Sequence, residues 1–223
     1  RAVVIEFIVP CVDILDKAGI SSFWDPKKVS SVITLQYPAP DPSVAELHKR
    51  MRNIAAEKNL SCFYGHAGIV NQVVVEKGDI LPGQLVVGTD SHSTTYGVMG
   101  AAGTGLGITD MAQVLATGQT WLRVPESVRF TLTGRPQPGV MSKDVILYLI
   151  GKYGSDFATY KSIEFRGDFV DQMSIASRTV MSNMGEEMGA KFSMFSADEK
   201  VLKYLNSRTN FGIDNFGPDE DAY

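Results

Sequence analysis

The chain has 223 residues, of which 21 are Lys or Arg and 25 are Asp or Glu, so its formal net charge is −4. Without a basic cluster, this balance argues against a surface for nucleic acid or anionic membranes. The apolar runs fall far short of the ~20 residues that a membrane-spanning helix needs.

The first half of the chain alternates β-rich runs with helical periodicity, which predicts α/β architecture. The pattern predicts a buried strand over Val3–Val9, and a helix that begins at Ser43 with a Ser43/Glu46 capping box. A second buried strand is expected over residues 84–87. After a glycine-rich stretch, a helix capped by Thr109 is expected to extend through Trp121.

The second half repeats this alternation after Pro125. The pattern predicts a strand over residues 128–132, a helix from Ser142, and a longer helix over residues 174–190. A last helix is expected behind Ser196, with a loop over residues 206–223. We therefore expect two domains, over residues 1–123 and 124–223.

The chain has two cysteines, Cys11 and Cys62, which are too few for a disulfide framework and form no CxxC pair for zinc or iron. Cys11 lies in a strand-like stretch, where a buried structural thiol is the default. No basic leader precedes that stretch. We expect a trimmed chain from a reducing, intracellular compartment.

The sharpest local feature is the run Asp90, Ser91 and His92, directly after the predicted strand over residues 84–87. In open α/β sheets ligands bind beyond the carboxyl ends of strands, so a carboxylate, a hydroxyl and an imidazole could meet a small polar ligand there. The alternative is an ordinary polar turn with a solvated histidine.

The surrounding segment, Gly83–Arg123, resembles the large subunit of 3-isopropylmalate dehydratase, whose wider family includes homoaconitase and aconitase. The resemblance continues through residues 124–126, 142–146, 183–190 and 219–222, and so covers most of the chain. It implies three-layer α/β/α domains of the aconitase type, of which this chain is an N-terminal portion that lacks the cluster-binding region. It also implies hydro-lyase chemistry on hydroxy-di- or tricarboxylates at a [4Fe–4S] cluster.

The resemblance assigns catalytic positions to Asp90, His92 and Glu187, and substrate-binding positions to Ser91 and Asn183. It implies that Glu187 pairs with His92 within hydrogen-bond reach. On the predicted helix, Asn183 would lie one turn before Glu187 on the same face. Taken alone, Glu187 would be interpreted as a solvated helix charge.

Two positions depart from the family pattern. Where the family has an Asp–His dyad this chain has Gln36 and Tyr37, and where it has a further histidine this chain has Asn71. An amide can hydrogen-bond but cannot carry a proton near pH 7. Asp90 is therefore expected to lack its usual partner, and His66 is expected to be solvated or bonded to a carbonyl rather than to replace the lost histidine.

These departures favour a degenerate, non-catalytic relative that acts as a structural or assembly subunit of a larger complex. The alternatives are the N-terminal part of an active [4Fe–4S] hydro-lyase and a module that only binds a small hydroxy-carboxylate. We expect no cofactor or metal on this chain, unless a missing C-terminal region or a partner supplies three cysteines for a cluster. Other protein subunits are the expected partners, with the mitochondrial matrix favoured over cytoplasm or plastid.

Overall fold

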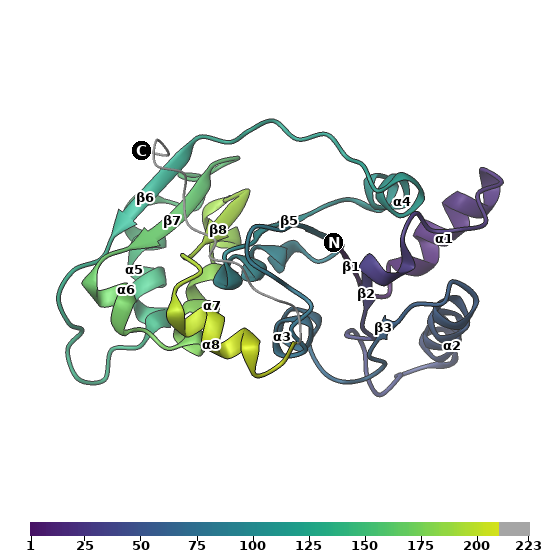
Figure 1. The fold of residues 1–223 in the computed structure, drawn as a ribbon, viewed down its shortest axis with the longest axis horizontal. Coiled ribbons are helices and arrows are strands. Elements are labelled where there is room, and N and C mark those ends of the chain that lie inside the picture. Colours follow the sequence, from purple (N-terminus) through teal and green to yellow (C-terminus); the bar gives the residue numbers. More distant parts are fainter. Residues whose placement is uncertain (210–223) are drawn as a thin grey trace.

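The computed structural model describes residues 1–209, which form two parallel β-sheets joined by an extended linker (Figure 1). The first sheet has the strand order β3-β2-β1-β4-β5 and the second has the order β6-β7-β8. The strands of the two sheets are β1 (Ala2–Val4), β2 (Val29–Ser31), β3 (Cys62–Phe63), β4 (Leu85–Gly88), β5 (Ala102–Gly105), β6 (Ser127–Thr131), β7 (Ser162–Arg166) and β8 (Phe192–Met194). Its α-helices are α1 (Ile8–Lys17), α2 (Pro42–Glu57), α3 (Val70–Glu76), α4 (Ile108–Thr117), α5 (Ser142–Tyr153), α6 (Asp168–Gln172), α7 (Ile175–Asn183) and α8 (Glu199–Asn206). Three 3-10 helices complete it: η1 (Pro26–Lys28), η2 (Ser91–Met99) and η3 (Glu186–Met188).

Helices cover both faces of the first sheet. Successive side chains of a strand point to opposite faces, so Ala2 and Val4 join one core while Val3 and Ile5 join the other. The first core packs against α1, α2 and α4, and the second against α3, η2 and α8. This sheet is therefore the middle layer of an α/β/α sandwich, which confirms the predicted α/β architecture.

The second sheet has one strongly apolar face. Phe130 of β6 stands opposite Phe165 of β7, and both rings are buried against α5 and α7. Buried behind this core, Arg178 of α7 donates a 2.6 Å hydrogen bond to Asp198, the N-cap of α8. A buried guanidinium needs such a partner, so this ion pair fixes α8 against α7.

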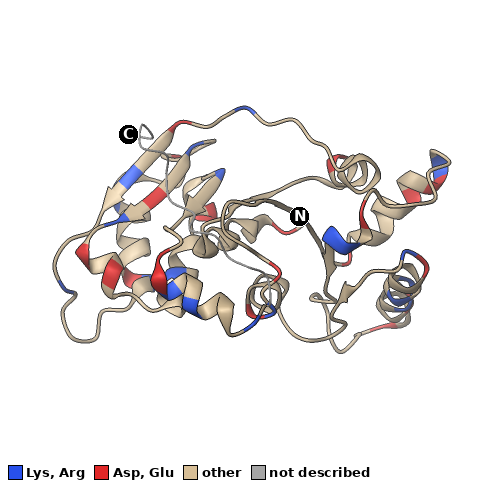
Figure 2. Ribbon diagram, in the orientation of Figure 1, with Lys and Arg blue, Asp and Glu red and all other residues tan. Residues whose placement is uncertain are grey.

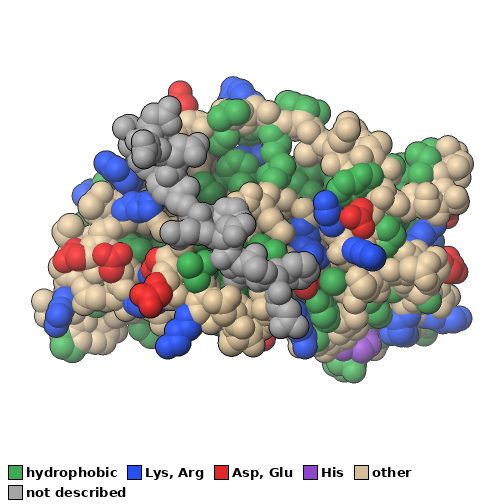
Figure 3. Space-filling view, viewed as in Figure 1, with side chains coloured by type: hydrophobic (Ala, Val, Ile, Leu, Met, Phe, Trp, Pro, Cys, Tyr) green, Lys and Arg blue, Asp and Glu red, His purple; other side chains and the backbone are tan. Residues whose placement is uncertain are grey.

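The linker over residues 118–126 runs as an extended arch between α4 and β6 (Figure 1). Two of its apolar side chains are largely exposed, Trp121 at 81% and Val124 at 89%. Apolar side chains accordingly gather along the upper edge of the molecule in Figure 3, where the linker runs. Helix α8 packs Val201 and Leu205 into the core of the first sheet, so both halves of the chain contribute to that core, and the boundary at 123/124 stays a prediction.

The N-terminal strand is shorter than predicted. Strand β1 ends at Val4 and α1 begins at Ile8, so the apolar run Val3–Val9 spans a strand, a turn and the first helical turn. A fully buried strand and a fully buried helix both give a continuous apolar run, and the pattern cannot separate them. Cys11 therefore lies in a helix and not in a strand, although it is buried as expected.

Three predicted helix caps are each displaced by two positions. Asp41 caps α2 by accepting from Ser43 N and Val44 N, Gly107 stands at the start of α4, and Asp198 caps α8 in place of Ser196. A carboxylate caps a helix as effectively as a hydroxyl does, so at α2 and α8 an Asp close to the predicted Ser is the cap. Helix α4 also ends early, at Gly118 in the left-handed conformation (φ 71°), and leaves Trp121 outside it.

The single helix predicted over residues 174–190 is two elements. Helix α7 ends at Asn183 and η3 follows after a turn at Gly185. A Cβ on Gly185 would lie 2.4 Å from Ser193 Oγ, so the chain closes onto β8 at this glycine. Asn183 and Glu187 therefore do not share a helix face. The predicted loop over 206–223 is helical at Asn206, and its residues 210–223 lie outside the described part.

Basic and acidic side chains are spread over both halves of the ribbon in Figure 2. No helix of residues 1–209 is long and apolar enough to cross a membrane.

Candidate functional site

The candidate site lies where the parallel strands of the first sheet end. Asp90, Ser91 and His92 follow β4 and begin η2. Glycines let this segment sit close to the sheet: a Cβ on Gly88 would lie 2.0 Å from Ser93 Oγ, and one on Gly103 would lie 2.3 Å from Ser93 O. The close approach anchors the Asp90–His92 turn at the edge where ligands bind in open α/β sheets.

His92 is held from both sides of its ring. Its Nδ1 lies 3.1 Å from Ser91 Oγ and its Nε2 lies 3.1 Å from Glu187 Oε1. The predicted His92–Glu187 contact is therefore confirmed. The side chains are 35% and 51% exposed, so the pair stands at the surface of the site and can meet a ligand. The catalytic role of both residues stays a prediction.

Asp90 lacks the usual histidine partner, as expected, but an amide takes that place. Its Oδ1 accepts from Asn71 Nδ2 at 2.7 Å and from His92 N at 2.9 Å. Asn71 is 7% exposed, and its own Oδ1 is buried without a hydrogen bond among the described residues. The amide thus replaces the expected histidine as a hydrogen-bond donor, which holds Asp90 in place without supplying an acid or base near neutral pH.

Asn183, the other predicted substrate-binding residue, faces η2. Its Nδ2 donates to Thr95 Oγ1 at 2.9 Å, and its backbone oxygen accepts from Thr94 Oγ1 at 3.2 Å. The structure gives it no contact with His92 or Glu187 among the described residues. In this state Asn183 joins α7 to η2, and substrate binding by it stays a prediction.

A cavity of about 450 Å³ adjoins the Asp90 turn between the two sheets. Its wall is formed by residues after β4, after β5 and around η3, namely Thr89, Asp90, Ser91, Thr104, Gly105, Leu106, Gly107, Tyr160, Glu186, Gly189, Ala190 and Lys191. Burial raises the pKa of Glu186 in this wall. The nearby carboxylates of Glu187 and Asp90 raise it further, while His92 and Lys191 oppose the change.

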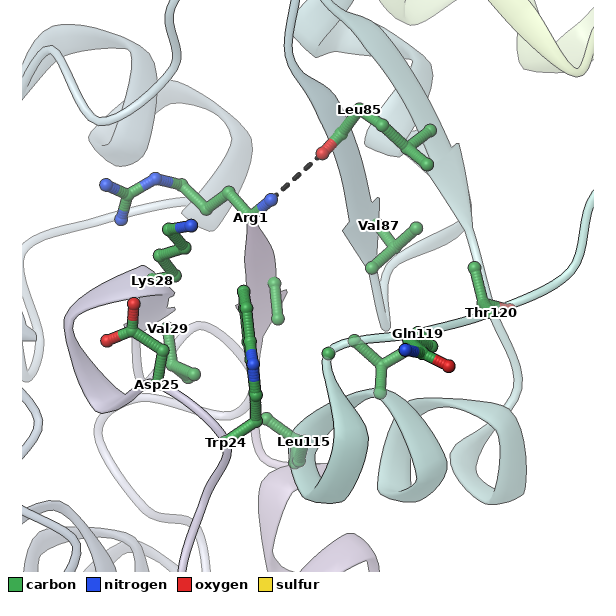
Figure 4. Close-up of a pocket in the computed structure, with 13 residues that line it drawn as sticks. Arg1, Trp24, Asp25, Lys28, Val29, Leu85, Val87, Leu115, Gln119 and Thr120 are labelled. Atoms are coloured by element: carbon green, nitrogen blue, oxygen red, sulfur yellow. Dashed lines mark hydrogen bonds between the residues drawn. The ribbon is translucent and has the colours of Figure 1, made fainter.

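A second cavity, of about 460 Å³, lies at the opposite edge of the first sheet (Figure 4). It is bounded by the amino ends of β1 and β4, where Arg1 donates its terminal N–H to Leu85 O at 2.9 Å, and by Trp24. The carboxyl-end cavity has the polar loops that this fold class uses for ligands, so we take that one as the candidate site.

A second Glu–His pair, which sequence reasoning missed, lies at the carboxyl-end edge of the first sheet, away from the Asp90 turn. Glu6 follows β1, and its Oε1 accepts from Thr34 N at 2.8 Å and from Leu35 N at 2.7 Å. His48 of α2 lies 3.8 Å from that oxygen, and the pair is 4% and 3% exposed. The one available signal was a charged residue inside the apolar run Val3–Val9.

Next to this pair, the ring of His66 stacks on Tyr37 with centroids 3.8 Å apart and meets His48 edge-on. Burial, and after it His48, lowers the pKa of His66. The expectation of a solvated or carbonyl-bonded His66 was therefore incomplete, because the exposed imidazole is an aromatic partner of Tyr37.

The cysteine sites do not fit an iron–sulfur cluster. Cys11 is fully buried in α1, where burial raises the pKa of its thiol to about 12, and Cys62 lies on β3. A cluster needs several thiolates aimed at one point, whereas this sequence contains two cysteines in all. Within residues 1–209 no three His, Cys, Asp or Glu side chains converge as a metal site.

Comparison with known proteins identifies the architecture. The profile of the aconitase family (aconitate hydratase) matches residues 25–216. This chain belongs to the aconitase family. A 3-isopropylmalate dehydratase large subunit of Methanopyrus kandleri is 44% identical over 209 residues, which are 93% of this chain and 50% of that protein. A probable methanogen homoaconitase large subunit of Methanothermobacter thermautotrophicus is 42% identical over 211 residues, or 94% of this chain and 49% of that one.

A third aconitase-family relative, the 3-isopropylmalate dehydratase large subunit of Aquifex aeolicus, is 40% identical over 212 residues, which are 95% of this chain and 49% of that protein. The chain therefore spans about half the length of the curated relatives it matches. Over that half, the chain resembles large subunits of 3-isopropylmalate dehydratase.

Proposed function

We propose that this chain is a non-catalytic member of the aconitase family that acts as a structural or assembly subunit and retains a site for a small hydroxy-carboxylate. The observation that carries the proposal is the 2.7 Å hydrogen bond from Asn71 to Asp90. It gives the carboxylate a partner that cannot exchange a proton near neutral pH, at the position where the family has a histidine.

The loop after β2 supports the same proposal. At the position of the family's Asp–His dyad, Gln36 takes a left-handed conformation (φ 53°) and Tyr37 stacks on His66. An amide and a phenol do not reproduce the carboxylate and imidazole of that dyad, so two of the expected proton-transfer positions are altered together.

The exposed linker supports a role in assembly. Trp121 and Val124 present apolar surface on an extended segment, and the relatives are about twice as long as this chain. Exposed apolar surface of this kind is typical of protein interfaces. We propose that protein subunits cover it, in an intracellular compartment where Cys11 and Cys62 remain free.

We further propose that no cofactor binds to this chain and that any [4Fe–4S] cluster in the assembly is held by cysteines of other sequence. Only this chain's own residues then act at the site: Ser91 and Glu187 orient the imidazole of His92.

The decisive experiment assays hydration of aconitate and dehydration of 3-isopropylmalate by the full native assembly after cluster reconstitution. We expect no turnover. Rates within the usual enzyme range of about 1–10³ s⁻¹ that fall in a His92→Ala variant would overturn the non-catalytic role. An Asn71→Ala variant is the matched control, because on this proposal it changes nothing in the assay.

The second candidate is the N-terminal half of an active hydro-lyase, and the intact His92–Glu187 pair at 3.1 Å favours it. It requires a cluster supplied by other sequence. Iron and acid-labile sulfide analysis of the native assembly tests this requirement. Stoichiometric iron and sulfide with measurable turnover would establish the second candidate in place of the first.

A further inference from the structure

We propose that Lys191, held against the ring of Tyr160, binds the second carboxylate of a hydroxy-dicarboxylate in the cavity beside Ser91. The inference deepens the ligand-binding part of the proposed function and rests on it. Neither Lys191 nor Tyr160 was among the site residues predicted from the sequence.

Lys191 is a half-buried ammonium that forms no ion pair in the described structure, although the Glu186 carboxylate in the same cavity wall acts on it electrostatically. Lys191 immediately precedes β8 and forms part of the wall of the 450 Å³ cavity. Its Nζ lies 5.5 Å from the centroid of the Tyr160 ring. Within residues 1–209 this Nζ forms neither an ion pair nor a hydrogen bond, whereas the backbone N of Lys191 donates to Lys161 O. A cation that is partly removed from water and faces a cavity is the group that an anionic ligand would complete.

Tyr160 is fixed in place, which makes it a suitable support for Lys191. Its Oη donates to Arg123 O at 3.2 Å and accepts from Arg123 N at 3.1 Å. The guanidinium of Arg123 lies 4.6 Å from the ring centroid. Tyr160 also has φ 57°, a left-handed conformation that bulky residues rarely adopt and that tends to occur at functional sites. The aromatic ring and its two cationic neighbours therefore form a preorganised wall.

The opposite wall indicates what else the ligand must carry. Ser91 contributes a hydroxyl, and Gly107 leaves open space, because a Cβ built on it would meet no atom within 4 Å. Gly107 also precedes α4 without a side-chain cap, although this helix end alone would not define a site.

Asp90 and Glu186 lie in the same cavity wall and repel a simple anion. They accept hydrogen bonds, so they suit a ligand that brings a hydroxyl group along with its carboxylates. A hydroxy-dicarboxylate meets these requirements, with one carboxylate directed at Lys191 and its hydroxyl at the acceptors. A monocarboxylic hydroxy acid would leave the ammonium unpaired.

The test measures binding by titration calorimetry on the full-length protein with the subunits that co-purify with it. The probes are malate and lactate, two hydroxy acids that differ in the second carboxylate. For the unchanged protein we expect malate to bind at least about tenfold more tightly than lactate. In Lys191→Met the malate affinity should fall to that of lactate, the lactate affinity should stay unchanged, and Lys191→Arg should recover most of the difference.

Lys161→Met is the matched control, because Lys161 is also half-buried and also lies over an aromatic ring, that of Phe157 at 5.3 Å, but it does not line this cavity. It should leave both affinities unchanged, and thermal unfolding checks that all variants fold. Equal binding of malate by Lys191→Met and the unchanged protein would overturn the role of Lys191 alone. Failure of the unchanged protein to bind either acid at millimolar concentration would overturn the retained ligand site as well, while hydro-lyase turnover bears only on the non-catalytic role.

Discussion

Two Glu–His pairs stand at the same edge of the first sheet and differ mainly in burial. Glu6 and His48 are 4% and 3% exposed, with Glu6 Oε1 3.8 Å from the imidazole. Glu187 and His92 are 51% and 35% exposed and lie 3.1 Å apart. The buried pair is closed to ligands and bound to the backbone, whereas the exposed pair borders the candidate site. The comparison teaches that the same two residue types serve the fold in one place and are free for a ligand in the other.

The buried pair holds the loop after β2. Both hydrogen bonds from Thr34 N and Leu35 N converge on one oxygen of Glu6, and its other oxygen is buried with no partner among the described residues. Removing a buried acceptor leaves its donors unsatisfied, which costs more than the hydrogen bonds contribute net. Energetic effects should therefore concentrate at this end of the edge.

The largest effect is expected from Glu6→Ala, which leaves two backbone N–H groups without an acceptor and His48 without its carboxylate. We expect the free energy of unfolding to fall by about 2–4 kcal/mol, measured by urea denaturation. Glu187→Ala is the comparison and should change stability by less than about 0.5 kcal/mol. Similar losses of stability in the two variants would show that burial does not explain why one Glu–His pair stabilises the fold and the other does not.

An intermediate effect is expected at Asn71, which is buried and donates a hydrogen bond to Asp90. Asn71→Leu removes the donor to the Asp90 carboxylate and should lower stability by about 1–2 kcal/mol, because hydrogen bonds to charged groups are the stronger ones. The measurement is again urea denaturation, with the exposed Asn53→Leu as control. A neutral or stabilising Asn71→Leu would indicate that this contact contributes nothing to the folded state.

A smaller effect is expected for the exposed pair itself. A double-mutant cycle with His92→Ala and Glu187→Ala should give a coupling free energy below about 1 kcal/mol, since both side chains compete with water. The coupling should weaken further when the salt concentration is raised. A coupling of several kcal/mol that does not change with salt would show that the His92–Glu187 pair stabilises the fold as a buried pair does.

The smallest effect is a pH dependence from Glu186. Its pKa is raised in the folded protein, so between the unfolded and folded pKa values the folded state binds more protons and stability falls as pH rises. Glu186→Gln should therefore be more stable relative to the unchanged protein at pH 7 than at pH 4, by thermal unfolding. Glu57→Gln, at an exposed position on α2, controls for the loss of charge. An advantage that is equal at both pH values, or larger at pH 4, would contradict the burial of Glu186.

Several features were predictable because they depend on residues close together in the chain. The helix predicted to begin at Ser43 is present as α2, with Val44, Met51 and Ile54 buried. The strand before Asp90 lies within one residue of its predicted bounds. Caps and helix ends were less predictable, since Asp41 and Asp198 compete with nearby serines on nearly equal terms. The turn at Gly185 depended on the approach of β8, which no local pattern reports.

The sequence by itself determined the α/β class, the family and the residues that stand at the His92 turn, because strand and helix periodicity and short motifs are local. The tertiary structure decided which side chains meet. Glu187 contacts His92, which is 95 residues away in the sequence, and Asn71 binds Asp90, which is 19 residues away. Lys191 and Tyr160 lie together in the cavity wall. Such contacts depend on strand order and on how the second sheet packs against η2. Burial depends on the same packing, and it separates one Glu–His pair from the other.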